Sequence, residues 1–180
     1  LQCIPNMVIA SPSNENEARK LLSSVYQYEG PAAVRYPRGQ GPGEKINRDL
    51  ESVKIGKANL LKKGSSKLIM LNFGSLLNHA KEIAKKYDMT LIDMRFIKPF
   101  DEGILKKYSN AKWFITIEDG SLIGGIGSTI ANWVTEQNFK IQVKCFGIPD
   151  KFIEHMSREQ MIKEAKLDYE SITKELDKIF

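Results

Sequence analysis

Two arginines three positions apart, in the run Arg35-Tyr36-Pro37-Arg38-Gly39, have the clearest chemical potential in the chain. The run begins within a strand that is predicted over residues 32–36, so the arginines lie at the carboxyl end of that strand. A guanidinium group offers planar, forked donors that suit phosphate, and its charge does not titrate away near neutral pH. A surface arginine paired with a nearby carboxylate is the simpler interpretation. The residues alone leave both interpretations open.

A second candidate is the acidic pair Glu118-Asp119, which follows the predicted strand over residues 113–117. The carboxyl edge of a parallel sheet is where α/β folds place ligands, and paired carboxylates there could exchange protons with a substrate. Adjacent strand residues, however, point to opposite faces of a sheet. We therefore expect a structural role, such as accepting hydrogen bonds from the amides of the following turn.

A third candidate is the glycine-rich run Gly124-Gly125-Ile126-Gly127-Ser128, between a predicted strand and a predicted helix. Such a turn could cradle a phosphate group. The run matches neither G-x-G-x-x-G nor G-x-x-x-x-G-K-[ST]. We expect its glycines to allow the helix to pack closely against neighbouring backbone.

The remaining reactive side chains are isolated in the sequence. Cys3 and Cys145 form no C-x-x-C motif, and we expect both to be reduced. His79 and His155 lie apart from each other and from any cluster with ligand spacing, so no metal site is predicted. The chain begins at Leu1 rather than Met, and we expect a fragment or a processed product.

Composition excludes several classes of protein. The chain has 27 Lys and Arg against 22 Asp and Glu, and the resulting net charge of +5 is spread along the sequence. A nucleic-acid-binding protein usually concentrates such an excess in one stripe, so no nucleic-acid partner is expected. No apolar run approaches the roughly 18 residues of a spanning helix, so no membrane partner is expected either.

The elements that must position these residues fall into two groups. A strand over residues 7–10, a helix opened by a capping box at Asn14 and reaching about Tyr28, and a strand over residues 32–36 form a strand–helix–strand piece. This piece is too small to bury a core and should pack against protein outside the chain. Glycine-rich, charged residues 40–55 resemble a linker. We predict an incomplete domain over residues 1–39 and a complete one over 56–180.

The second group predicts the fold class. We expect a hairpin formed by residues 58–61 and 67–71, strands over 90–94, 113–117 and 141–146, and helices between and after them, one capped by Asp101 and one opened by a capping box at Ser157. Nearly all-apolar strands that alternate with helices indicate an α/β fold. The prediction is a mostly parallel sheet with helices on both faces, preceded by a partial βαβ piece of a second α/β domain.

Several strings together resemble one family. They resemble, in the same order, strings in the latter part of the 1-deoxy-D-xylulose-5-phosphate synthase family. The strings are residues 4–17, 30–31, 33–39, 71–75, 91–99, 125–128 and 147–153. This family belongs to the transketolase-like superfamily, whose members have three α/β domains. The resemblance implies that residues 1–39 are the end of the domain that binds the cofactor's pyrimidine. Residues 56–180 would be the transketolase C-terminal domain.

The resemblance also implies an activity for the parent protein. The family consists of transferases that condense pyruvate with D-glyceraldehyde 3-phosphate, giving 1-deoxy-D-xylulose 5-phosphate and CO2. They use thiamine diphosphate and Mg2+, and their product supplies isoprenoid precursors by the non-mevalonate route as well as thiamine and pyridoxal. The resemblance implies a cytoplasmic, bacterial-type homodimer, with a plastid location for some related enzymes.

For the site, the resemblance carries over a single residue, Arg38, which would bind the phosphate of glyceraldehyde 3-phosphate. The family's metal-binding Gly-Asp-Gly…Asn motif, its cofactor-activating glutamate and its catalytic histidines have no counterpart here. We therefore expect no catalytic, cofactor-binding or metal-binding residue in this chain, and no cofactor or activity in the chain alone. Arg35 and Tyr36 are assigned structural roles.

Two alternatives remain. One is a non-catalytic transketolase-C-like module that only binds partner chains. The other is the C-terminal half of a 2-oxoacid dehydrogenase beta component, which shares the domain order. The run Arg35 to Gly39 and the string Asn72-Phe73-Gly74 favour the synthase. The partners expected under that hypothesis are the remainder of the parent chain, a second copy and small-molecule substrates.

Overall fold

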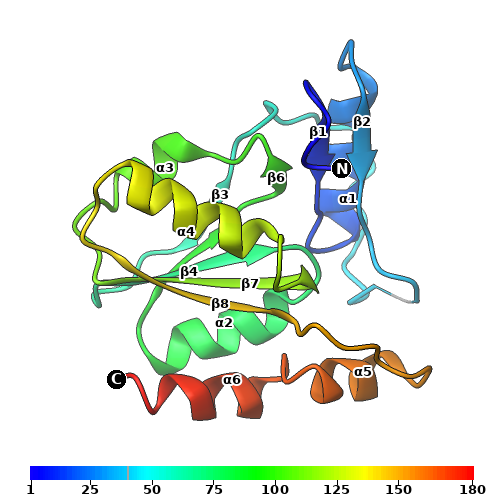
Figure 1. Ribbon diagram of the computed structural model, residues 1–180. Coiled ribbons are helices and arrows are strands. Elements are labelled where there is room, and N and C mark those ends of the chain that lie inside the picture. The colour runs from blue at the N-terminus through cyan, green and yellow to red at the C-terminus, as the bar shows by residue number, and fades with distance from the viewer. Residues whose placement is uncertain (40) are drawn as a thin grey trace.

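Four apolar strands build the central sheet of the computed structural model, which describes residues 1–39 and 41–180 (Figure 1). β4 (Leu68–Phe73) pairs in parallel with β5 (Thr90–Asp93) and β7 (Trp113–Ser121), and β7 pairs in parallel with β8 (Gln142–Ile148). β3 (Asn59–Lys62) adds an antiparallel edge, which gives the order β3-β5-β4-β7-β8.

Helices cover both faces of this sheet. α3 (Glu102–Lys106) and α4 (Ile126–Glu136) lie on one face, while α2 (Leu77–Lys86) and α6 (Tyr169–Leu176) lie on the other, with α5 (Arg158–Glu164) beyond the sheet edge (Figure 1). Side chains of β4 alternate between the two cores: Ile69 and Leu71 face the α4 side, and Met70 faces the α2 side. The predicted α/β class, with a mostly parallel sheet between two helical layers, is confirmed.

The predicted hairpin between residues 58–61 and 67–71 is wrong. β3 pairs with β5, because β4 is central and already has a parallel neighbour on each side. The connection between them packs against the turn before β5: Ser65 N donates to Asp88 Oδ2 at 2.9 Å, and Ser66 Oγ donates to the Asp88 carbonyl at 2.7 Å. Asp88 thus binds the connection between β3 and β4 next to the start of β5, and β3 lies at the edge of the sheet.

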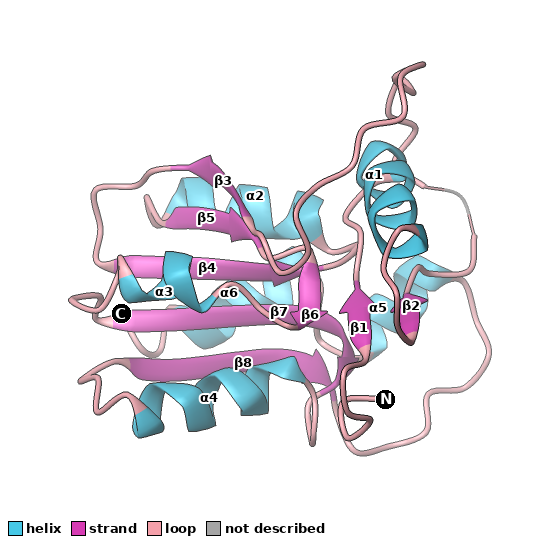
Figure 2. Ribbon diagram, turned by 90° about the horizontal axis from the view of Figure 1, so that it is seen from above, coloured by secondary structure: helices cyan, strands magenta, loops and turns pink. Residues whose placement is uncertain are grey.

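The N-terminal piece forms a second sheet. β1 (Val8–Ala10), α1 (Glu15–Tyr26) and β2 (Ala32–Val34) have the predicted order, and β1 pairs in parallel with β2. On its other side β1 pairs antiparallel with β6 (Phe96–Lys98), a strand that the sequence did not indicate (Figure 2). The chain itself therefore supplies part of the cover that we expected from outside, because Phe96 is fully buried against the core of this piece.

Helix starts follow the predicted capping with one exception. Ser157 and Gln160 form the predicted capping box of α5, and the Asp101 side chain caps α3. At α1, Asn14 Oδ1 accepts from Glu17 N at 2.9 Å, but the Glu17 side chain binds Arg95 instead of returning to Asn14. The cap of α1 is therefore only half of a capping box, and the helix ends at Tyr26 rather than near Tyr28.

Residues 41–55 contain no helix or strand and lie against α1. Ser24 Oγ accepts from Val53 N at 2.7 Å, and a Glu15 carboxylate oxygen accepts from Gly43 N at 2.7 Å. The division of the chain into residues 1–39, 40–55 and 56–180 stays a prediction, with residue 40 outside the described part.

Candidate functional site

Arg38 lies at a pocket of about 390 Å³ between the end of β2 and α5. The pocket joins three parts of the chain: the run that follows β2, the ends of β7 and β8, and α5 with the loop before it. Its basic side chains are Arg35, Arg38, Lys151 and Arg158. The sequence pattern indicated Arg35 and Arg38 as candidate site residues. It did not indicate Lys151 and Arg158, because only the fold brings residues this far apart in the chain to the same pocket.

The two arginines of the run after β2 differ in their partners. Arg35 Nη2 lies 2.5 Å from Asp119 Oδ1 and also donates to the Asp119 carbonyl, so the surface ion pair considered for these arginines is formed by Arg35. Arg38 is exposed and has no hydrogen bond or ion pair with any residue that the structure describes. Its guanidinium is available to an anion, and its role at phosphate stays a prediction.

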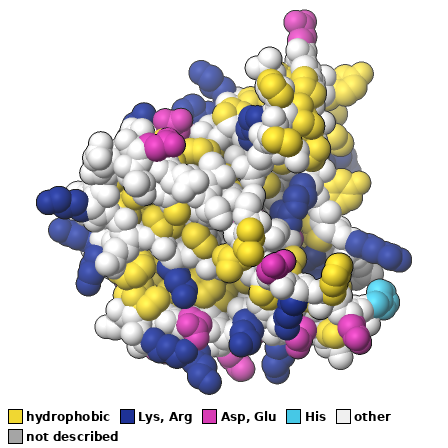
Figure 3. All heavy atoms as spheres, viewed as in Figure 1, with side chains coloured by type: hydrophobic (Ala, Val, Ile, Leu, Met, Phe, Trp, Pro, Cys, Tyr) yellow, Lys and Arg dark blue, Asp and Glu magenta, His cyan; other side chains and the backbone are white. Residues whose placement is uncertain are grey.

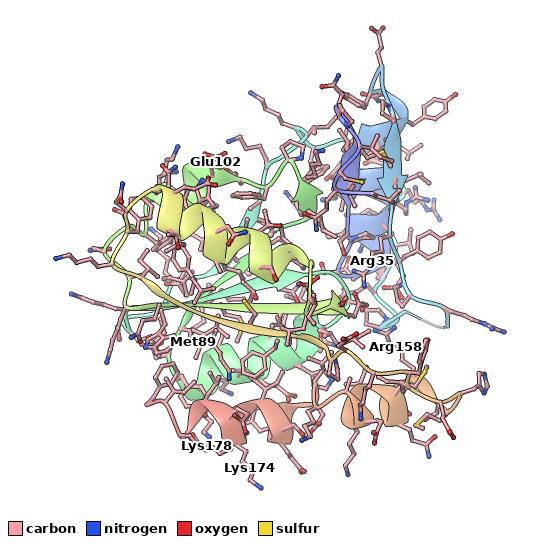
Figure 4. The ribbon with its side chains drawn as sticks, in the orientation of Figure 1. Arg35, Met89, Glu102, Arg158, Lys174 and Lys178 are labelled. Carbon is pink, nitrogen blue, oxygen red and sulfur yellow. The ribbon has the colours of Figure 1, made fainter. Side chains whose placement is uncertain are left out.

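Asp119 connects the three segments around the pocket. Besides Arg35, it accepts a hydrogen bond from Ser75 Oγ, and its Oδ2 lies 3.8 Å from Arg158 Nη2. Arg158 Nη2 in turn donates to Ser75 Oγ at 2.6 Å. Figure 4 shows Arg35 and Arg158 reaching this region from the N-terminal piece and from α5. The pocket floor is therefore held by charge-assisted hydrogen bonds from both ends of the chain.

Glu118 points away from Asp119, as strand alternation predicts, although β7 continues through both residues to Ser121. The buried Glu118 carboxylate accepts from Gly127 N at 2.9 Å, and burial raises the pKa of Glu118 above its ordinary value. This contact confirms the structural role that we expected, binding the amides of the following turn.

The glycine-rich turn is filled by protein. A Cβ on Gly125 would lie 2.0 Å from the Ser121 carbonyl oxygen, and one on Gly127 would lie 2.7 Å from Thr116 Oγ1. These approaches support the close-packing interpretation. The Gly127 amide that a phosphate would need already binds the Glu118 carboxylate.

The expectation that this chain alone binds neither thiamine diphosphate nor Mg2+ stays a prediction. Within residues 1–39 and 41–180 there is no group of three or more His, Cys, Asp or Glu that could hold a metal ion. The glycine turn is occupied by Glu118, as described above. Cys3 and Cys145 are both unpaired, and burial raises the pKa of the Cys145 thiol.

A buried polar network ties the N-terminal piece to the central sheet close to this pocket. Arg95 forms two hydrogen bonds with the Glu17 carboxylate, at 2.6 and 2.8 Å, and both side chains are only 12% exposed. Ser13 Oγ donates to Asp93 Oδ2 at 2.6 Å, and Asn72 Nδ2 lies 3.3 Å from Asp93 Oδ1. Burial raises the pKa of Asp93 to about 6. The sequence analysis missed these pairs, although both Asp93 and Arg95 lie in a string that carries the family resemblance.

The family model described as "Transketolase, C-terminal domain" matches residues 56–172. The chain belongs to this family. It is also 46% identical over 179 residues to a protein of Hahella chejuensis, covering 99% of this chain and 28% of that protein. A Marinomonas protein is 42% identical over 177 residues, covering 98% of this chain and 28% of its own length, and a Francisella tularensis subsp. novicida protein is 46% identical over 182 residues, covering 99% and 29%.

All three relatives are named 1-deoxy-D-xylulose-5-phosphate synthase, which confirms the resemblance noted in the sequence. This member of the transketolase C-terminal domain family spans less than a third of their length. Among solved structures, it is similar to a chain described as "Split gene transketolase, inactive beta4 tetramer", with a TM-score of 0.82 and 25% identity over 98% of this chain and 58% of that one. None of the helices in the described ranges is long and apolar enough to span a membrane.

Proposed function

We propose that this chain is the C-terminal part of a 1-deoxy-D-xylulose-5-phosphate synthase, which condenses pyruvate with D-glyceraldehyde 3-phosphate and releases CO2. The observation that supports the proposal is the 42–46% identity to proteins of that name over nearly the whole chain. Thiamine diphosphate and Mg2+ would be held by the remainder of the protein, and we expect this chain alone to be inactive.

Within such a synthase, Arg38 would bind the phosphate of the aldehyde substrate. The phosphate is a dianion that needs charged donors, and Arg38 presents an exposed guanidinium at the rim of a basic pocket. Pro37 restricts the backbone next to it, and the Arg35–Asp119 pair anchors the same run to β7. These contacts would orient Arg38 before the substrate arrives.

The remainder of the parent chain is the partner that we propose for the N-terminal piece, within a cytoplasmic homodimer. Leu22 and Tyr26 on α1 are 59% and 90% exposed. Figure 3 shows hydrophobic side chains gathered over the part of the molecule formed by β1, β2 and α1. An incomplete pyrimidine-binding domain would leave such a surface for its missing half to cover.

A chimera tests the proposal directly. Residues 1–180 would replace the segment of the Hahella chejuensis protein that they match, and formation of 1-deoxy-D-xylulose 5-phosphate from both substrates would be measured by mass spectrometry. We expect the chimera to be active and the same protein without the segment to be inactive. A folded, cofactor-binding chimera without activity would contradict the proposal.

The second candidate function is the non-catalytic assembly module, and one observation favours it. The split-gene transketolase chain to which this chain is similar is described as an inactive tetramer, that is, as an assembly without activity. A module of this kind would assemble with the remainder of the Hahella chejuensis protein without restoring product formation, so the chimera separates the two candidates.

A further inference from the structure

We propose that Arg158 and Lys151, from the C-terminal part of the chain, join Arg38 in binding one phosphate dianion in the pocket between β2 and α5. The inference rests on the proposed function for the identity of the ligand, but the site itself is argued from the pocket. Nothing in the family match or in the motifs of the sequence assigns a ligand to Arg158 or Lys151.

The charge of the pocket matches a phosphate monoester. Arg35, Arg38, Lys151 and Arg158 line it, and the carboxylates that pair with them are Asp119 and Glu164. Four basic groups against two carboxylates leave an excess of two positive charges. A phosphate monoester carries close to two negative charges at neutral pH, so it would neutralise this excess.

Arg158 has donors to spare for such a ligand. Its Nη2 donates to Ser75 Oγ at 2.6 Å and stands 3.8 Å from Asp119 Oδ2, whereas Nε and Nη1 have no hydrogen bond to any residue within the described ranges. A guanidinium carries five N–H donors in a fixed fork. The bond to Ser75 therefore fixes the group at the pocket wall while other donors remain for a phosphate oxygen.

Lys151 would contribute less than Arg158 to phosphate binding. It pairs with Glu164, but the two side chains are 44% and 52% exposed, and exposed pairs of this kind are easily exchanged for another partner. Beside these cations the pocket wall is apolar, with Ile148, Ile153 and Met161 among its side chains. A small carbon chain bearing a phosphate fits a wall of this composition.

The first experiment uses the 180-residue chain and inorganic phosphate. Phosphate would be titrated at constant ionic strength, with chloride as the exchanged anion, and binding would be followed by amide NMR shifts. We expect saturable binding that shifts residues around Arg38, Lys151 and Arg158. Arg158→Ala should weaken it about 10-fold or more, because a charged hydrogen bond is lost. Lys174→Ala, which removes an equal charge from the exposed face of α6, should leave the affinity unchanged.

The result that overturns the proposal is a phosphate titration without saturation, or one that Arg158→Ala and Lys174→Ala alter equally. Thermal unfolding of both variants would check that they are folded. If Arg158 only crosslinks α5 to Ser75, then Arg158→Ala lowers the melting temperature and leaves the phosphate affinity unchanged, which also overturns it.

The second experiment identifies the source of the phosphate and uses the chimera. If the ligand is the substrate, Arg158→Ala raises KM for glyceraldehyde 3-phosphate about 10-fold and leaves the constants for pyruvate and unphosphorylated glyceraldehyde unchanged. If phosphate binding is weakened but these constants all stay the same, the pocket binds a different phosphorylated ligand, and the proposed site stands. An inactive chimera would contradict the proposed function, while the phosphate titration would still decide the site.

Discussion

The two sheets of the molecule are stabilised in different ways. In the central sheet, β4 and β7 have six and nine residues, and most of their side chains are buried between helices. In the three-stranded sheet, β1, β2 and β6 have three residues each. The piece that contains β1 and β2 is joined to the rest by apolar contacts of Met7, Ile9 and Phe96 and by polar pairs. Those pairs are Arg95–Glu17, Ser13–Asp93 and Arg35–Asp119.

The two parts should differ in how strongly they depend on individual residues. Apolar burial is spread over many side chains, so one conservative change in the central sheet removes only a fraction of it. A buried ion pair adds little net stability over an apolar pair of the same size, but removing one partner leaves an unpaired charge. The junction between the sheets should therefore be specific in its geometry and sensitive to single substitutions.

Removing the N-terminal piece should have the largest effect. We expect residues 56–180 to unfold cooperatively by themselves, because the central sheet and its helices lie within that range. Phe96 would lose its cover, which costs about 1.5–3 kcal/mol, and Arg95 and Asp119 would lose partners. A melting temperature roughly 5–15 °C below that of the full chain should follow.

Calorimetry of both chains side by side measures this difference. A broad, non-cooperative transition for residues 56–180 would show that the two sheets form one inseparable core. An unchanged melting temperature would show that the polar junction contributes nothing.

Breaking the buried ion pair should have the next largest effect. Arg95→Met leaves the Glu17 carboxylate buried without its partner and should lower the free energy of unfolding by about 3–5 kcal/mol. The double variant Glu17→Gln with Arg95→Met should recover part of that loss, because no charge stays buried. Urea unfolding of the single and double variants measures both quantities.

The matched control is Lys106→Met, which breaks the pair with Glu102 on α3. Both of those side chains are about half exposed, and pairs of this kind contribute about 0–1 kcal/mol. If Arg95→Met and Lys106→Met cost the same, the junction is no more sensitive than the surface.

The same contrast explains what the sequence could predict. β4, β5, β7 and β8 were identified because their apolar residues are contiguous and their caps and turns are local. β6 was missed because three residues carry no period, and its partner β1 lies far away in the chain. The hairpin was wrong for a related reason: the pairing of an edge strand depends on which central strand has a free side.

The site residues could likewise be predicted where the signal is local in the sequence, and not where it depends on the fold. Arg38 was found because a continuous string resembles a family motif. Arg158 lies in no such string, and Lys151 lies in the string 147–153, which suggested no ligand for it; only the packing of α5 beside the end of β2 places both at one pocket. Glu17 was assigned to a cap because that role is local, whereas its partner Arg95 is contributed by the other part of the chain.

Asp93 gives the junction a pH dependence. Burial raises its pKa from 3.8 to about 6, so between pH 4 and 6 the native state binds a proton that the unfolded state releases. The stabilisation from that proton is present below about pH 4 and is lost as the pH rises through about 6. Relative to Asp93→Asn, the chain should lose about 3 kcal/mol of unfolding free energy from pH 4 to pH 7.

Denaturant unfolding at a series of pH values measures this difference. Asp88→Asn is the control: hydrogen bonds from Ser65 lower the pKa of Asp88 to about 2, so its contribution should be constant over the same range. A wild-type curve parallel to that of Asp93→Asn would mean that the Asp93 carboxyl is not perturbed by burial.

Arg38→Ala should have a smaller effect, confined to one substrate. In the chimera, the lost charge-assisted hydrogen bonds correspond to about 1.5–3 kcal/mol, or a 10- to 150-fold lower kcat/KM for glyceraldehyde 3-phosphate. The constant for pyruvate should change little, because pyruvate has no phosphate. Steady-state kinetics with unphosphorylated glyceraldehyde as a second acceptor is the check. An equal loss with both acceptors would exclude the phosphate role.

For thiamine diphosphate and Mg2+, we expect no binding to the 180-residue chain, which is the smallest effect predicted. Neither sheet offers a metal cluster among the described residues, and the glycine turn between β7 and α4 is filled by the Glu118 carboxylate. Calorimetric titration of the 180-residue chain with thiamine diphosphate and Mg2+ should therefore give no saturable heat, while the chimera, titrated in parallel, should give a normal isotherm. Micromolar binding by the chain alone would contradict this prediction. Loss of that binding in Arg38→Ala would then indicate that the basic pocket holds the cofactor's diphosphate, since the basic side chains at that pocket outnumber the carboxylates that pair with them.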